Sequence, residues 1–422
     1  MRRRPTAVAG LALTMTACLA ACASESGPPV LTWYTTPDAG GQAEIARTCS
    51  EAAEGEYRIE ISLLPNDAPG QREQLARRLA ASDASIDIMS LDPPFIPEIA
   101  EPGFLAPMPE ELADVFVEDV VQGAVDSATW DGELVTAPFL SNTMLLWYRK
   151  SVVEEAGLDM SQPVTWDQII EVARDQGKYL GVQGVKAESM TVWVNALMAS
   201  QGAEILPDPA APADELEVAL DSPEGQRAAE IMSTIASEGL GGPGMPTEDE
   251  DASLNEFLGD NGSFMVNWPF VWPGAQSTAP DVVEDIGWAM YPQVEEGTES
   301  APPVGGLNLG VGAFSEHVDL AYDAVQCLVQ PDNQAMYVET NGNAPVGADV
   351  YDRPEIQEAY PMADLLRDSL ERAVPRPQTP YYNEVSIGLQ ETWYPISDLD
   401  PERTPAEATE LITGVLRGER LL

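Results

Sequence analysis

The residues that follow the N-terminal segment alternate between strand-like and helix-like runs, and this order restricts the fold more than any other feature. Residues 30–36, 57–65 and 86–92 are rich in β-branched and aromatic side chains, and the last run, IDIMSLD, is almost continuously apolar. Residues 40–53 and 70–82 carry apolar residues at helical spacing. A strand–helix–strand–helix–strand order predicts an α/β fold with a parallel sheet.

Two acidic residues fall directly after predicted strands. Asp38 follows the first strand and Asp92 ends the third. In open α/β sheets, ligands bind in the crevice outside the carboxyl ends of the strands. The sequence therefore places Asp38 and Asp92 at the edge where a ligand would bind.

The rest of the chain is more helical, but strand character returns near residues 284–292 and 305–314. Thr165 and Gln168 have the spacing of a capping box, and Pro223 suits the first turn of another helix. This order suggests two lobes joined by chain crossovers. The crossovers are expected at the segments 137–142, 266–274 and 339–347.

The N-terminus reads as an export signal. Arg2, Arg3 and Arg4 precede a short apolar run, which ends in the sequence Leu-Ala-Ala-Cys at residues 19–22. This ending resembles the bacterial lipobox, which implies cleavage before Cys22 and lipidation of its sulfur. An ordinary secretory signal is the alternative. The lipid would anchor an otherwise soluble body to a membrane face.

Charge excludes some partners. The chain has 70 Asp and Glu against 21 Lys and Arg, a formal net charge of −49, yet 44% of its residues are hydrophobic. A sizeable core can therefore form, and no basic stripe is available for phosphates. The sequence predicts no nucleic-acid partner and no electrostatic grip on anionic lipid.

Four cysteines are present, and two of them are available for a disulfide in the mature body. Cys18 leaves with the signal and Cys22 is the lipidation site, which leaves Cys49 and Cys327. An export context permits a disulfide. From the residues alone two interpretations stay open, a Cys49–Cys327 disulfide or two separate buried thiols.

Catalytic patterns are weak. The single histidine, His317, stands beside Glu316 in a predicted helix, which favours an exposed side chain over a general base. No nucleophile, phosphate-loop or metal-ligand motif occurs in a suitable context, so neither a metal nor another cofactor is expected. Carboxylate pairs are abundant enough that a glycosidase pair has little specificity.

The stretch FMVNWPFVW, residues 264–272, concentrates aromatic residues. Phe264, Val266 and Phe270 are interpreted as a buried strand. Trp268 stands before a proline, where the chain must turn, so its ring can face a cleft. A flat apolar ring with polar groups around it suits the apolar face and hydroxyl rim of a pyranose. From spacing alone, binding and core packing remain equal alternatives for Trp268.

Several motifs together carry a family resemblance. LAAC, QREQLARRL, IDIMSLD, SNTMLLWYRK, VNWPFVW, GGLNLGVGAF and RPQTP occur in the order expected of an extracytoplasmic sugar-binding protein of an ABC importer. More narrowly, the chain resembles the LpqY-type trehalose-binding lipoproteins of actinobacteria along nearly its whole mature length. The resemblance implies a two-lobed Venus-flytrap α/β fold with three hinge crossovers. It divides the chain into a signal (1–21), a first lobe (22–138 and 273–341) and a helix-rich second lobe (139–272 and 342–422).

The resemblance also implies roles for particular residues. Asp92, Asn142 and Glu250 would bind sugar hydroxyls, Trp268 would stack on one glucose, and Arg376 would donate a fork of hydrogen bonds. The backbone of Gly306 and Leu307 would line the floor, with Asp38 and Gln71 in neighbouring loops. The resemblance further implies that Cys49 and Cys327 are paired.

The function implied is capture of trehalose between the lobes and delivery to the subunits of an ABC permease. The protein is expected to be a monomer, anchored through Cys22 at the extracytoplasmic face of the cell membrane, and not an enzyme. Maltose or another short glucoside is the alternative ligand. A lipid-anchored glycoside hydrolase is the enzyme alternative, and a structural or adhesive lipoprotein is the third class considered.

Overall fold

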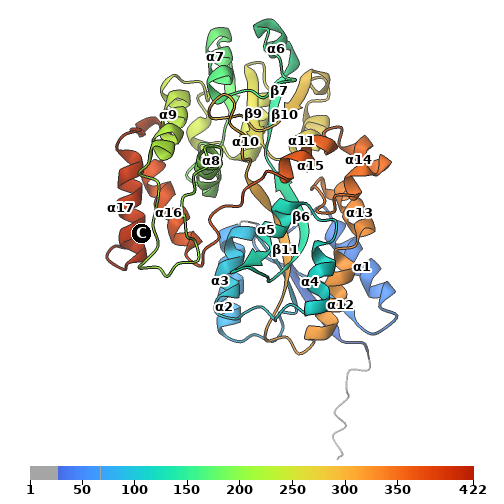
Figure 1. Ribbon diagram of the computed structural model, residues 1–422. Helices are drawn as coiled ribbons and strands as arrows, with labels where there is room; N and C mark the ends of the chain where they lie inside the picture. Colours follow the sequence, from blue (N-terminus) through green and yellow to red (C-terminus); the bar gives the residue numbers. More distant parts are fainter. Residues whose placement is uncertain (1–26, 67) are drawn as a thin grey trace, which may run out of the picture.

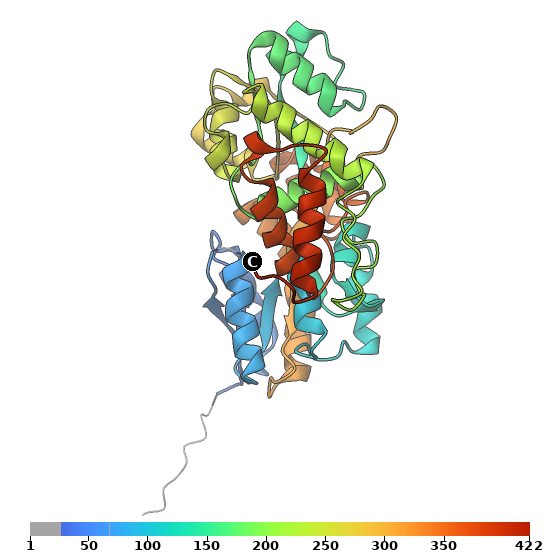
Figure 2. The same cartoon turned by 90° about the vertical axis from the view of Figure 1, so that its left-hand side faces the viewer.

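The computed structural model describes residues 27–66 and 68–422, which form two lobes stacked along one axis (Figure 1). Each lobe is built around its own sheet. The view turned by 90° shows the same stacking, with the C-terminal helices beside the junction of the two lobes (Figure 2). The predicted signal 1–21 and Cys22 lie outside the described residues.

The first lobe contains a five-stranded sheet of order β2-β1-β3-β11-β6. Strand β1 pairs in parallel with β2 and β3, whereas β11 runs antiparallel to β3 and β6. The predicted α/β order over residues 30–92 is thus confirmed. The strands are β1 (Val30–Thr35), β2 (Arg58–Leu63), β3 (Ile88–Leu91), β6 (Ala137–Thr143) and β11 (Val304–Val311); β4 (Thr129–Trp130) and β5 (Glu133–Leu134) form a small separate hairpin.

Helices cover both faces of this sheet, which gives the first lobe three layers. On one face α1 and α12 bury apolar side chains such as Ile45 and Val325, and on the other α2 and α3 bury Leu75 and Ile99. The helices are α1 (Gly41–Ala52), α2 (Ala68–Ala80), α3 (Ile96–Ala100), α4 (Glu110–Val117), α5 (Gln122–Ser127), α12 (Val318–Leu328) and α13 (Pro331–Asn341).

Cys49 of α1 and Cys327 of α12 form a disulfide, with their Cα atoms 5.8 Å apart. The bond joins two helices on the same face of the first sheet, 278 residues apart in the chain. Of the two interpretations that the residues left open, the paired one is therefore present.

The second lobe contains a four-stranded sheet of order β10-β7-β9-β8. Its central strands bury most of their side chains, and Phe264 and Leu146 are completely enclosed. The strands are β7 (Leu145–Arg149), β8 (Tyr179–Gly181), β9 (Gly262–Asn267) and β10 (Ile286–Ala289).

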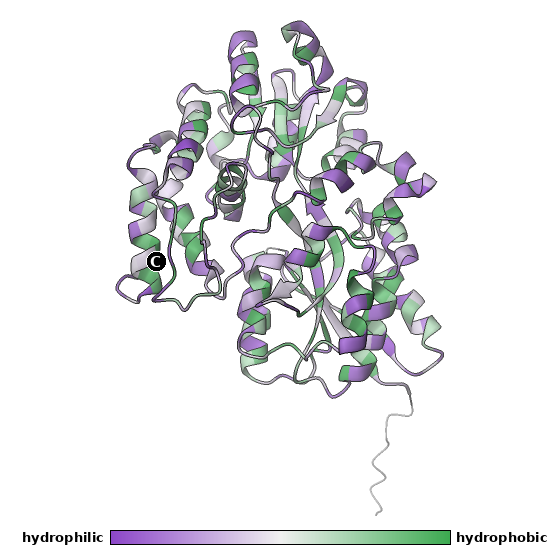
Figure 3. Cartoon of the chain, viewed as in Figure 1, coloured by the Kyte–Doolittle hydropathy of each residue, from purple (hydrophilic) through white to green (hydrophobic). Residues whose placement is uncertain are grey.

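Helices dominate the second lobe. One large core lies among α7, α8, α9, α16 and α17, and a second lies between the sheet and α10, α11, α14 and α15. In Figure 3 hydrophilic residues gather on the outer turns of these helices. The bounds are α6 (Lys150–Ala156), α7 (Trp166–Gln176), α8 (Glu188–Ala199), α9 (Pro223–Ser237), α10 (Glu250–Leu258), α11 (Val271–Thr278), α14 (Pro354–Ala359), α15 (Ala363–Leu370), α16 (Tyr382–Trp393) and α17 (Thr404–Leu416).

Local signals in the sequence set several helix starts. Thr165 Oγ1 accepts a hydrogen bond from the Gln168 amide at 3.2 Å, and Gln168 Oε1 accepts one from the Thr165 amide at 2.8 Å. This reciprocal pair is the predicted capping box at the start of α7. Helix α9 begins at Pro223, as predicted, with the Ser222 hydroxyl capping it.

The chain passes between the lobes three times, but one passage differs from the prediction. The first lies between β6 and β7, near the predicted segment 137–142, and the third begins after α13. The second lies between β10 and β11, at residues 290–303, instead of 266–274. The reason is that β10 pairs antiparallel with β7, so residues 273–289 remain with the second sheet and not with the first lobe. The remaining lobe boundaries stay a prediction.

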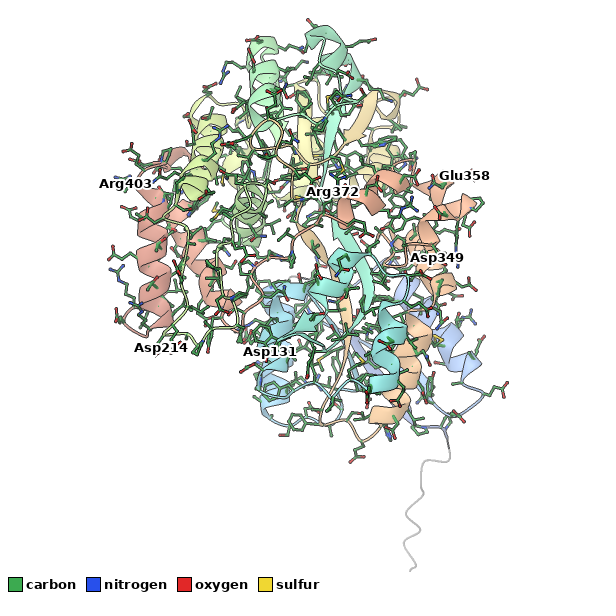
Figure 4. The ribbon with its side chains drawn as sticks, viewed as in Figure 1. Asp131, Asp214, Asp349, Glu358, Arg372 and Arg403 are labelled. Carbon is green, nitrogen blue, oxygen red and sulfur yellow. A yellow bond between two sulfur atoms is a disulfide. The ribbon has the colours of Figure 1, made fainter. Side chains whose placement is uncertain are left out.

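The acidic residues are spread over the exterior. Asp131, Asp214, Asp349 and Glu358 are exposed and come from widely separated parts of both lobes (Figure 4). A distributed charge of this kind keeps a protein soluble.

Candidate binding site between the lobes

Two adjoining cavities lie where the lobes meet, and together they are lined by all nine residues predicted for the site. One of about 420 Å³ is lined by Asp38, Gln71 and Leu307 among others, and one of about 310 Å³ by Glu250, Trp268 and Arg376. The residues that line both are Asp92, Asn142, Gly306 and Asn343. The cavities therefore form one continuous cleft.

A larger hollow of about 850 Å³ lies on the outer surface of the second lobe, between α9 and residues 397–403. It is open to solvent, and Arg227 within it already pairs with Asp167 and Glu230. None of the nine residues predicted for the site lines it. We therefore place the candidate site in the cleft between the lobes.

A buried arginine joins the two walls of this cleft. The Arg376 side chain is 4% exposed, and its Nη2 donates to Asp92 Oδ1 at 2.6 Å. Its Nη1 donates to Glu188 Oε1, which also accepts from the Tyr382 hydroxyl. Asp92 directly follows β3 of the first lobe, and Glu188 is the first residue of α8 in the second. Arg376 thus forms an ion-pair bridge across the cleft.

Burial sets the protonation of this network. Burial, supported by the charge of Glu188, raises the pKa of Asp92 to about 6, although the Arg376 charge opposes the shift. Burial also works against the charge of Arg376, but the carboxylates of Asp92 and Glu188 outweigh it and raise the pKa of Arg376 further. Burial and the Glu188 charge raise the pKa of Tyr382, so its hydroxyl remains a donor.

Trp268 lies against the backbone of the opposite lobe. A Cβ atom added at Gly305 would come within 3.0 Å of the Trp268 ring, so a glycine is needed there for the close approach. Gly306 has φ +126°, a conformation that side chains rarely adopt, and its backbone passes over Leu140. The ring is partly buried and lines the cleft rather than the core.

Asn267, the last residue of β9, fixes both Trp268 and Glu250. Its Oδ1 accepts from the Trp268 amide at 2.8 Å, and its Nδ2 donates to the Glu250 carbonyl at 2.9 Å. Asn267 is completely buried, and its own carbonyl accepts from Trp147 Nε1 at 3.0 Å. One amide therefore sets the spacing between the aromatic ring and an acidic group of the cleft.

Glu250, and not one of its acidic neighbours, lines the cleft because of how α10 begins. Asp249 caps this helix, accepting from the Ala252 amide at 2.9 Å, so Glu250 occupies the first helical position. Burial, in the first place, raises the pKa of Glu250. The acidic run TEDED thus supplies one cap and one cleft residue.

Asn142 lies next to the last residue of β6, where the chain leaves the first lobe. Its Nδ2 donates to Asn343 Oδ1 at 3.2 Å, and its Oδ1 accepts from the Ala344 amide at 3.1 Å. The two asparagines come from two of the interlobe passages. They place a pair of side-chain amides at the hinge side of the cleft.

Asp38 and Gln71 line the cleft but are held by their own loops. Asp38 accepts from the amides of Gly40 and Gln42 at 2.9 and 2.8 Å, and from Asn341 Nδ2 at 2.7 Å. Gln71 Nε2 donates to the Pro65 carbonyl at 2.9 Å. Asp38 thus shapes the start of α1, and less of its oxygen capacity is left for a ligand.

The structure corrects one expectation in the aromatic stretch and adds residues to the site. Phe264 and Val266 are buried in β9, but Phe270 stands at the start of α11 and lines the cleft, because the chain turns at Pro269. Sequence reasoning missed Glu188 and Asn343. An acidic residue in the first turn of a helix and an asparagine in a turn are each too common to signal a site.

Neither a metal nor a membrane span is indicated by residues 27–66 and 68–422. Among them, no group of three or more His, Cys, Asp or Glu side chains is arranged to hold a metal ion. None of their helices combines the length and the apolarity that crossing a membrane requires.

Comparison with known proteins identifies the family. The model of the bacterial extracellular solute-binding proteins matches residues 35–335, which is more than half of the chain. The chain belongs to this family. Its relatives include a probable ABC transporter-binding protein of Deinococcus radiodurans, 23% identical over 379 residues that cover 85% of this chain and 86% of the relative. A maltotriose-binding protein of Pyrococcus abyssi is 24% identical and is matched over 70% of this chain and 62% of its own length.

Solved structures of extracellular solute-binding proteins share the two-lobed fold. Maltose-bound MalE3 of T. maritima is 26% identical, with a TM-score of 0.76 over 92% of this chain and 99% of that one. The sugar-binding protein MalE from Xanthomonas citri has a TM-score of 0.78 at 20% identity, over 93% and 98% of the two chains. The predicted Venus-flytrap architecture is thereby confirmed.

Proposed function

We propose that this protein captures trehalose, or a closely related glucose disaccharide, between its lobes and delivers it to an ABC permease. The observation that carries the proposal is the arrangement around Trp268. One flat aromatic ring faces a cavity bordered by Asp92, Glu188, Glu250 and the buried fork of Arg376. A ring for the apolar face of a pyranose and carboxylates for its hydroxyl rim are the two elements that sugar recognition requires.

The size and charge of the cleft support a small neutral ligand. The cavities of about 310 and 420 Å³ fall within the range of roughly 300–1,000 Å³ that small-molecule sites occupy. Three carboxylates and one arginine leave the immediate surroundings of Trp268 acidic. Such a site disfavours anionic ligands and suits hydroxyl donors, because carboxylates accept hydrogen bonds strongly.

Closure of the lobes would enclose the ligand between the two walls of the cleft. Asp92 and Asn142 come from the first lobe and its hinge side, whereas Glu188, Glu250 and Trp268 come from the second. The full set of contacts exists only when the two walls meet, so a sugar stabilises the closed arrangement by its differential affinity. The closed form would then dock on the permease, and the sugar would be released unchanged.

The choice of sugar rests on the resemblance, with maltose as the alternative. Trehalose is favoured by the family resemblance, which rests on a set of motifs that includes VNWPF and RPQTP. Maltose is favoured by the names of relatives such as maltose-bound MalE3. A glycoside hydrolase is less favoured because Arg376 occupies both Asp92 and Glu188, which leaves neither carboxyl free as a general acid.

A thermal-shift screen followed by calorimetric titration tests the proposal. Trehalose, maltose, maltotriose, mannitol and sucrose would be titrated into the mature protein, and the sugar would be recovered afterwards. We expect a saturable rise in unfolding temperature with trehalose, because a ligand that binds only the native state stabilises by RT ln(1 + [L]/Kd). Cleavage of the recovered sugar would establish the hydrolase instead, and no shift with any glucoside would refute the proposal.

A further inference from the structure

A third cavity continues the cleft beyond the acidic groups that surround Trp268. It has a volume of about 460 Å³, and Glu188 and Glu250 form its boundary with the disaccharide site. Ala68 lines both this cavity and the larger part of the cleft. The space is therefore an extension of the same cleft and not a separate surface hollow.

The wall that the first lobe contributes to this cavity is apolar. Ala68 and Pro69, at the start of α2, and Phe95, three residues after Asp92, line it. The Phe95 ring is held edge-on against Tyr382, with centroids 5.3 Å apart and an angle of 76° between the planes. Tyr382 in turn donates to Glu188, so the apolar wall is fixed to the acidic boundary.

The wall that the second lobe contributes carries hydrogen-bonding groups. Ser189 lines the cavity, but its Oγ is enclosed and offers no surface to a ligand. The side-chain amide of Asn383, on α16, has no hydrogen-bond partner among the described residues. Gln390 Nε2 donates to Ser386 Oγ at 3.1 Å, which leaves the Gln390 carbonyl oxygen for a ligand.

These two walls have the chemistry of a sugar subsite. An apolar surface on one side suits the C–H face of a pyranose, and two side-chain amides on the other suit its hydroxyl groups. An acyl chain would fill the same volume but would cover the Asn383 amide and the Gln390 carbonyl oxygen without giving them hydrogen bonds, which is unfavourable.

We propose that this cavity is a subsite for a third hexopyranose, so that the natural ligand class extends to a glucose trisaccharide built on the disaccharide bound at Trp268. This inference rests on the proposed function and assigns the longer ligand to that same cleft. Asn383 and Gln390 would bind the hydroxyls of the third ring, with its apolar face toward Pro69 and Phe95.

The test compares ligands of different length in two variants and a control. Ile387→Trp would fill the cavity from α16, and Asn383→Ala would remove one amide while leaving the shape. Val115→Trp is the matched control for adding an indole, because Val115 is 44% exposed on α4 and does not line the cleft. Trehalose, trehalose carrying one further α-linked glucose, maltotriose and octyl α-glucoside are titrated by calorimetry into each protein.

We expect the wild-type chain to bind a trisaccharide at least as tightly as trehalose. Ile387→Trp should weaken binding of the trisaccharide by at least about tenfold, because the indole would occupy the space of the third ring. Asn383→Ala should weaken it by about fivefold, because one lost hydrogen bond is worth about 1 kcal/mol. Binding of trehalose should change by less than about twofold in both variants. Val115→Trp should change neither ligand.

The outcomes separate this inference from the proposed function. Binding of trehalose with a trisaccharide about tenfold weaker or worse would overturn the subsite and leave the proposed function standing. Tight octyl α-glucoside binding without trisaccharide binding would also overturn it, in favour of an apolar pocket. Binding of no glucoside at all would overturn both.

Discussion

The two walls of the cleft are built in different ways. The first-lobe wall comes from one sheet: Asp92 follows β3, Asn142 lies at the end of β6, and Gly306 belongs to β11. The second-lobe wall is assembled from separate elements, with Glu188 and Glu250 at the first positions of α8 and α10 and Trp268 after β9. A single hydrogen-bonded sheet fixes the first wall, whereas packing between several elements fixes the second.

Side chains from both lobes join the two walls. Arg376 bridges Asp92 and Glu188, and Tyr382 orients Glu188 from behind. This buried charge network joins the walls together with the Phe95–Tyr382 ring contact and the packing of Trp268 against Gly305, and the sugar would add further contacts. Variants can separate the stability of one wall from the binding that needs both, and four are described below in order of expected effect.

The largest change in free energy is expected from removing the disulfide of the first lobe. Cys49→Ser with Cys327→Ser should lower the free energy of unfolding by about 2–5 kcal/mol, because the bond closes a very long loop. Cys49 of α1 is buried in the core, Cys327 of α12 packs against that core, and neither lines the cleft, so the sugar affinity of the folded protein should change little. Chemical denaturation and calorimetric titration below the unfolding temperature measure the two quantities. A large loss of affinity in the folded variant would show that the first wall depends on the disulfide.

Trp268→Ala tests the second wall. Losing the stacking ring should weaken sugar binding by about 2–4 kcal/mol, on the order of 30-fold to 1,000-fold, since a central aromatic anchor dominates a small site. Trp272→Ala is the matched control in the same stretch. Trp272 packs against Trp288 with ring centroids 5.3 Å apart, away from the cleft, so its loss should reduce stability and not affinity. Equal affinity losses in the two variants would refute the assignment of Trp268.

Asp92→Asn tests the bridge between the walls and its pH dependence. The amide keeps the shape but loses a charged acceptor, which should weaken sugar binding by about 1.5–3 kcal/mol. In the wild-type protein affinity should fall as pH drops below about 6, by at most about tenfold per pH unit, because the carboxylate is the form that accepts sugar hydroxyls. Calorimetric titrations from about pH 4.5 to about pH 8, on both sides of the Asp92 pKa of about 6, check this. The variant should lose that step.

The stability of the ligand-free protein should depend on pH in the opposite direction to the sugar affinity. The folded pKa of Asp92, about 6, is above its ordinary value of 3.8. Its contribution to stability is therefore fully present below the ordinary value and is lost as pH rises through about 6. Unfolding of the ligand-free protein should show this loss in the wild type and not in Asp92→Asn. The same loss in both would assign the effect to another group.

The smallest effect is expected from Tyr382→Phe. Removing the hydroxyl that donates to Glu188 should weaken sugar binding by about 1 kcal/mol, roughly fivefold, since Glu188 keeps its contact with Arg376. Tyr351→Phe is the control, because its hydroxyl donates to the Pro345 carbonyl in a buried part of the molecule away from the cleft. Unchanged affinity in Tyr382→Phe would show that Arg376 alone orients Glu188.

Most of the fold could be predicted from local patterns. The βαβαβ order over residues 30–92, the capping box of α7 and the proline start of α9 each depend on residues that are neighbours in the chain. The boundary near residue 273 could not be predicted in the same way. Strand β10 joins the second sheet because it pairs with β7, more than 130 residues earlier, and no local signal encodes that partner.

The sequence by itself determined the α/β class, the strand ends that carry Asp92 and Asn142, and the turn at Trp268 and Pro269. These follow from periodicity and from proline, which act over a few residues. Only the tertiary structure decided that Arg376 bridges Asp92 to Glu188, that Asn267 spaces Trp268 from Glu250, and that the cleft continues past Phe95. The physical reason is that these contacts join elements far apart in the chain, and they form only when the packed cores of both lobes bring those elements together.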